Sequence, residues 1–68
     1  MTPATYISWQ HRWTTSDECG FMLDLAARGK WRELESVARL IPMRRWDEGV
    51  DVARLQTKAA ELVATALE

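Results

Sequence analysis

The sequence contains very few of the residues from which small proteins build disulfides, metal sites and tight turns. Its 68 residues include one cysteine, one histidine, two prolines and three glycines. Cys19 cannot form a disulfide within the chain, and with His11 alone it cannot supply a zinc site of cysteine and histidine ligands. Chains this short are marginally stable, so we expect efficient helix packing, a homodimer, or stabilisation by a partner.

Long apolar runs and a large excess of one charge are also missing. No stretch approaches the roughly 18 apolar residues of a membrane span. The first residues, MTPAT, lack the basic flank and apolar core of a signal peptide. We therefore expect a cytoplasmic protein that does not bind a membrane. The nine basic and ten acidic residues give a net charge of -1. That balance makes nucleic acid a less favoured partner, because coating nucleic acid needs a basic excess.

The side chains needed for catalysis do not form a recognisable set. Cys19 and His11 are separated by about 12 Å of rise on a continuous helix, which is too far for a nucleophile and its base. No glycine-rich phosphate loop and no metal-ligand spacing occurs. Asp47, Glu48 and Asp51 cluster where a helix is expected to begin, and carboxylates there usually compensate the helix dipole. We expect no enzymatic activity, no cofactor and no metal.

What the sequence does contain is helical periodicity along most of its length. No segment alternates apolar and polar residues as a strand does, and no hairpin dipeptide such as Asn-Gly occurs. The sequence predicts one all-α domain over residues 1–68, a helical hairpin plus a C-terminal amphipathic helix packed as a small bundle.

The N-terminal part of the chain admits two interpretations. Thr2 and Pro3 are typical of a helix start, and a stripe of aromatic residues at helical spacing follows: Tyr6, Trp9 and Trp13. Thr15 and Glu18 form a capping-box pattern, which would begin a second helix. We favour a single long helix over residues 3–28. Its apolar face would continue through Cys19, Met22, Leu23, Leu25 and Ala26.

The remaining helices are delimited by glycine, proline and aspartate. Gly29 is expected at a left-handed helix end, and a second helix is predicted from Trp31 to Ile41, ended by Pro42. Its apolar stripe consists of Trp31, Leu34, Val37, Ala38 and Ile41, with Glu35 and Arg39 paired on the outer face. The last helix is predicted to begin near Asp47 or Asp51. Its apolar seam would pack on the hairpin or on a second copy through Val52, Leu55, Ala59, Leu62 and Ala66.

Four tryptophans are many for a chain of this length, and tryptophan and arginine dominate the energetics of many protein interfaces. Trp31 lies on the clean apolar stripe, so we expect it in the core. Trp46 follows two arginines in the least regular segment and is expected to be an exposed contact. The predicted partner-binding residues are Trp9, Trp13, Arg44, Arg45 and Trp46. A broader basic patch would form if Arg28, Lys30 and Arg32 lay close to Arg44 and Arg45.

The run MLDLAARGKWRELE at residues 22–35, together with Tyr6 and Gln10, resembles the FliT family of flagellar chaperones. The resemblance spans residues 6–41. It implies a helical bundle that holds an export substrate, namely the filament-cap protein. A flagellar regulator is a further partner that the resemblance implies. An amphipathic partner helix would then lie in an apolar groove, and residues 52–67 would cover that groove when it is empty.

We therefore expect a non-catalytic adaptor or chaperone that binds another protein. One alternative is a small transcriptional regulator or mobile-element-encoded inhibitor that binds DNA or a host protein, with a helix-turn-helix over residues 16–41. Glu33 and Glu35 on the second helix disfavour DNA binding, because they would face phosphate. The other alternative is a purely structural oligomerisation unit.

Overall fold

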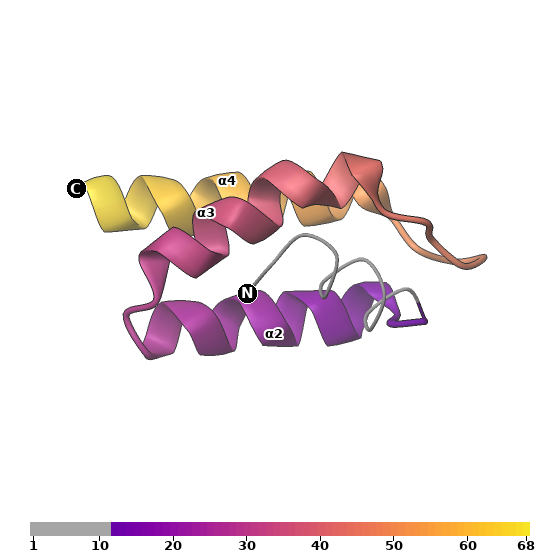
Figure 1. Ribbon diagram of the computed structural model, residues 1–68, viewed down its shortest axis with the longest axis horizontal. Helices are drawn as coiled ribbons and strands as arrows, with labels where there is room; N and C mark the ends of the chain where they lie inside the picture. The colour runs from indigo at the N-terminus through magenta and orange to yellow at the C-terminus, as the bar shows by residue number, and fades with distance from the viewer. Residues whose placement is uncertain (1–11) are drawn as a thin grey trace.

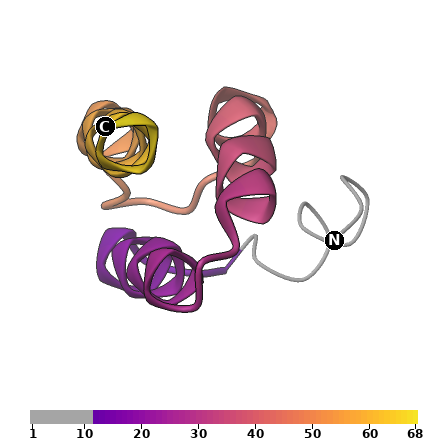
Figure 2. The same cartoon turned by 90° about the vertical axis from the view of Figure 1, so that its left-hand side faces the viewer.

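The computed structural model describes residues 12–68, which fold as a small all-α bundle (Figure 1). Its elements are α2 (Thr15–Ala27), α3 (Trp31–Leu40), the 3₁₀ turn η1 (Ile41–Met43) and α4 (Val52–Leu67). Each α-helix contacts the other two, and the end-on view shows them at the corners of a triangle (Figure 2). No strand occurs within residues 12–68. The predicted hairpin with a C-terminal helix is confirmed.

The start of α2 contradicts the preferred prediction of one long first helix. Residues 12–14 are not helical, and Thr14 has the extended backbone of an N-cap, with φ -79° and ψ 172°. The Thr14 side chain accepts from the Asp17 N–H at 3.2 Å, and the Asp17 carboxylate accepts from the Thr14 N–H at 2.9 Å. This reciprocal capping box begins a helix here. It lies one residue before the predicted Thr15–Glu18 pair. Tyr6 and Trp9 lie outside the described residues.

The turn between α2 and α3 is the predicted glycine hinge. Gly29 has a φ of 72°, a left-handed conformation that glycine adopts without a Cβ clash. The Lys30 N–H donates to the Leu25 carbonyl at 2.9 Å, and the Gly29 N–H donates to the Ala26 carbonyl at 3.1 Å. These two bonds are those of a Schellman motif. They stop α2 and allow α3 to fold back beside it.

The core follows the apolar stripes of all three helices. Its buried members are Met22, Leu25, Leu34, Val37, Ile41, Leu55 and Ala59. The α3 stripe is confirmed, with Trp31 and Ala38 half-buried at its edge. The α-helix ends at Leu40, one residue earlier than predicted, and tightens to a 3₁₀ turn over Ile41–Met43. Ile41 keeps α-helical backbone angles, but Pro42 has no N–H with which to continue the α-helical hydrogen bonds.

The last helix begins where the second of the two predicted starts placed it. Asp51 caps α4 by accepting from the Arg54 N–H at 3.0 Å. The Asp51 N–H in turn donates to the buried Thr15 hydroxyl at 2.8 Å, which ties the starts of α4 and α2 together. Leu55 and Ala59 pack against the hairpin. The apolar seam therefore packs on the hairpin, one of the two predicted candidates.

Two predicted apolar positions are not buried. Leu23 is 46% exposed, although it was assigned to the inner face of the first helix. Ala66, the last residue of the predicted seam, is exposed too. Its neighbour Leu67 is 82% exposed. These side chains lie beside openings between the helices and matter for the site described next.

Candidate protein-binding cleft

Three residues that the sequence did not connect meet inside the bundle. The Glu18 carboxylate, on α2, forms an ion pair with the Arg44 guanidinium, just after η1. Both side chains are fully buried. The Arg44 guanidinium also lies over the Trp46 ring, 4.2 Å from the ring centroid. The Trp46 indole N–H donates to the Ile41 carbonyl at 3.0 Å. This cluster joins α2 to the segment between α3 and α4.

This arrangement changes the interpretation of Arg44 and Trp46. Arg44 is only 4% exposed, and Trp46 is half-buried with its polar atom already bonded. The expectation of an exposed anchor at Trp46 is wrong, because its ring packs against the Arg44 guanidinium and its indole N–H donates to the Ile41 carbonyl. The other predicted contacts are elsewhere. Trp13 packs edge-on against Phe21 at 5.2 Å between ring centroids, Arg45 is exposed, and Trp9 lies outside the described residues.

The basic residues do not form one patch. Arg28, Lys30 and Arg32 lie at the start of α3, whereas Arg44 and Arg45 follow η1 beyond its other end. The ten residues of α3 separate the two groups by about 15 Å. In addition, Arg44 is buried and Arg28 is paired with Asp24 at 3.2 Å. The condition for a broader basic patch is therefore not met.

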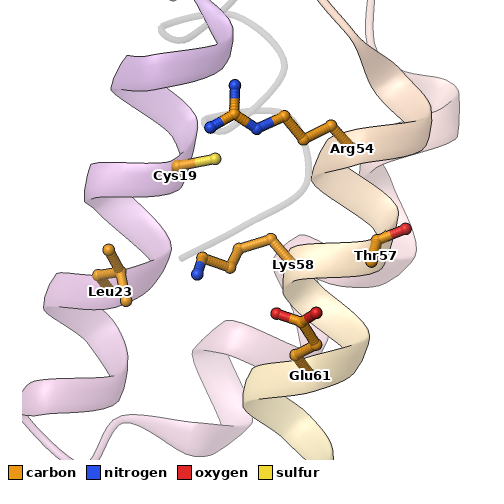
Figure 3. A pocket seen from close by; sticks show the side chains of 6 residues that line it. All are labelled: Cys19, Leu23, Arg54, Thr57, Lys58 and Glu61. Carbon is orange, nitrogen blue, oxygen red and sulfur yellow. The ribbon is translucent and has the colours of Figure 1, made fainter.

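A cleft of about 370 Å³ opens between α2 and α4 (Figure 3). Cys19 and Leu23 line it from α2, and the residues from α4 are Arg54, Thr57, Lys58 and Glu61. The Cys19 sulfur points across towards α4, and the long side chains of Arg54 and Lys58 extend back towards α2. Glu61 lies beside Lys58, one turn further along α4. The cleft thus combines a small apolar wall with a charged one.

The positions of these side chains follow from helical periodicity. Cys19 and Leu23 are four residues apart, as are Arg54 and Lys58, so each pair lies one above the other on its helix. Within residues 12–68, neither Arg54 nor Lys58 forms an ion pair with a carboxylate. Arg54 lies at the level of Cys19, and Lys58 extends towards Leu23 (Figure 3), which is 46% exposed. Long charged side chains can cover an apolar surface with their methylene groups while their charged ends stay in water.

A second opening lies on the other side of α4, against α3. Two adjoining hollows of about 270 and 90 Å³ share Glu35 and Val63. Alanines line the larger hollow, and Trp31, Ala66 and Leu67 line the smaller one. Glu35 and Arg39 on its rim form the predicted ion pair, with both side chains largely exposed. This groove is mostly apolar, and its charged lining residues are Arg32, Glu35 and Arg39.

Sequence reasoning missed the α2–α4 cleft although its residues carry a local signal. Arg54, Lys58 and Glu61 recur at helical spacing, a pattern usually assigned to a solvated helix face. Which helix lies opposite them is a tertiary property. Among the described residues, no three His, Cys, Asp or Glu side chains gather as a metal site would require. The helices of residues 12–68 are also too short or too polar for any of them to cross a membrane.

No protein-family model, curated protein or solved structure matches this chain.

Proposed function

We propose that this protein is a non-catalytic adaptor or chaperone that holds an amphipathic helix of another protein in the α2–α4 cleft. The observation that carries the proposal is the cleft itself, where a half-exposed leucine and the Cys19 thiol lie opposite two cations that form no ion pair within residues 12–68. Helix-in-groove recognition combines apolar anchors with rim charges in this way.

The resemblance of residues 22–35 to the FliT family supports a chaperone and makes a flagellar export substrate or regulator, in the cytoplasm, the first partner to test. The geometry modifies one expectation from that resemblance. Leu55 and Ala59 of α4 belong to the core, so α4 is a wall of the fold. Displacing α4 would expose these buried side chains, so we propose that the partner binds in the α2–α4 cleft and not in place of α4. Trp13 and Arg45, which do not line the cleft, remain predicted partner contacts, as does Trp9, which lies outside the described residues.

The regulator alternative gains no comparable support. The basic residues that a DNA-binding surface would use are split between the two ends of α3, and Arg44 is buried. A purely structural unit would leave the cleft empty or fill it with a second copy. Sedimentation at increasing concentration tests self-association directly, since a dimer dissociates on dilution.

The cleft offers its own probe, because Cys19 is the only cysteine in the chain. Proteins recovered with the tagged chain from its native cell are purified, and the rate at which Cys19 reacts with a thiol reagent is measured with each. A genuine partner should slow the reaction, since it covers the sulfur. Substituting Leu23→Asp should weaken binding at least about tenfold by burying a charge at the contact.

The matched control is Leu67→Asp, which places the same charge on the other exposed leucine, beside the α3–α4 groove. It should leave affinity and thiol protection unchanged. If Leu67→Asp abolishes binding and Leu23→Asp does not, the proposed cleft is the wrong site. Partners that never protect Cys19 would likewise refute the proposal.

A further inference from the structure

The α2–α4 cleft carries charges in a fixed order along one helix. Arg54 and Lys58 are one turn apart on α4, and Glu61 follows at the next position on the same face. The order along the wall is therefore positive, positive, negative. Figure 3 shows the two cationic side chains extending into the space between the helices. An occupant of the cleft must match this order.

The carboxylates of α2 do not satisfy these cations. Asp24 is paired with Arg28 at 3.2 Å, and Asp17 accepts hydrogen bonds from Thr14. Glu18 is buried and forms an ion pair with Arg44. The wall opposite Arg54 and Lys58 therefore presents a thiol and a leucine. Arg54 is exposed and Lys58 is half-buried, so both cations remain accessible to carboxylates of another molecule.

We propose that the partner helix carries two acidic side chains one turn apart, an apolar side chain beside them, and a basic or amide side chain one further turn along. The proposal rests on the proposed function and specifies its partner. Acids at i and i+4 are about 6 Å apart along a helix, the same spacing as the Cα atoms of Arg54 and Lys58. A third acid at the next turn would meet Glu61 and be repelled.

The apolar part of the partner is fixed by the α2 wall. Leu23 is 46% exposed and Cys19 is half-buried, so an apolar side chain seated between them would remove both from water. A small organic ligand fits less well. Small-molecule pockets are usually rich in aromatic side chains, whereas none of the six residues lining this cleft is aromatic.

A second copy of the chain does not offer the required pattern within residues 12–68. The acidic residues of its three α-helices are Asp17, Glu18, Asp24, Glu33, Glu35 and Glu61. No two of them are three or four residues apart. Asp47 and Asp51 are four residues apart, but they precede α4 and do not lie on a helix. No helix of a second copy therefore matches Arg54 and Lys58, and we assign the cleft to a helix of a different protein.

The test is a selection from a displayed library of helix-forming peptides in which apolar, acidic, basic and amide residues are equally represented. Binders are scored by protection of Cys19. Acids at i and i+4 should be enriched, with a basic or amide residue beyond them. The double variant Arg54→Glu/Lys58→Glu should weaken these peptides by at least about tenfold, because like charges then face each other. Selection on that variant should instead enrich lysine or arginine.

The control is Lys30→Glu/Arg32→Glu, which changes the net charge equally at the hairpin turn and should change affinity by less than about twofold. Binders that protect Cys19 and depend on Leu23, but carry no acidic pair or ignore the Arg54/Lys58 reversal, would overturn this inference and leave the proposed function standing. Protection of Cys19 by concentrated protein alone would assign the cleft to a second copy. If no peptide protects Cys19, the proposed function fails together with this inference.

Discussion

The buried Glu18–Arg44 pair gives the sharpest test of the fold. Each side chain is fully buried, and removing one partner of such a pair typically costs about 3–5 kcal/mol because a charge is left in the interior. A domain of this length has a total stability of roughly 3–10 kcal/mol. Glu18→Leu should therefore remove a large part of the stability, and Arg44→Met should remove slightly more, since its cation–π contact with Trp46 is lost too.

The informative measurement is a double-mutant cycle by urea unfolding, followed by circular dichroism. With a slope of about 1 kcal/mol per molar urea, a loss of about 3–5 kcal/mol in Glu18→Leu should lower the midpoint by about 3–5 M. The double variant Glu18→Leu/Arg44→Met should recover most of the loss, because replacing both charges by apolar side chains is often neutral or stabilising. Additive losses in the double variant, or a loss below about 1 kcal/mol in Glu18→Leu, would refute the reasoning.

The remaining predictions concern local structure. Gly29→Ala should destabilise the fold by about 1–2 kcal/mol because a Cβ at φ 72° is strained. Gly20→Ala, on an open helix face, should stabilise the fold by about 0.5–1 kcal/mol. Thermal unfolding compares the two variants, and equal effects would contradict the backbone conformation assigned to Gly29. Thr15→Val should lower the free energy of unfolding by about 1–3 kcal/mol because the Asp51 N–H loses its acceptor. An unchanged free energy of unfolding, measured by chemical denaturation, would show that water replaces the hydroxyl. Hydrogen bonds from Thr14 lower the pKa of the Asp17 carboxyl, so its stabilising contribution is present above the unfolded pKa of about 3.9 and is lost as pH falls through the lower folded pKa. Asp17→Asn should flatten that part of the stability–pH curve, and an unchanged curve would argue against the capping box.

The α3 segment shows how much of this fold local sequence predicts. Leu34, Val37 and Ile41 recur at the helical period and are buried as expected. Gly29 and Pro42 mark its two ends by their own backbone restrictions. These features depend on residues within one or two turns, so the sequence alone contains the information. The same holds for the Asp51 cap of α4.

The first helix shows where local reasoning fails. Thr14 with Asp17 and Thr15 with Glu18 are equivalent capping patterns in the sequence, and only packing distinguishes them. Thr15 and Glu18 are buried because they bond to Asp51 and Arg44, which lie far along the chain. The other pair then remains at the surface to cap the helix. Pattern matching has no access to that competition.

The sequence by itself determined that the chain is helical, that helices end near Gly29 and Pro42, and which stripes of α3 and α4 face inward. It could do so because the helix period and the backbone restrictions of glycine and proline are local properties. Only the tertiary structure decided that Arg44 is buried against Glu18 and that Arg54 and Lys58 face Cys19 and Leu23 across a cleft. Whether a charged side chain lies in the core or on a binding wall depends on which residues the fold brings opposite it. That is a property of three helices together and of none of them alone.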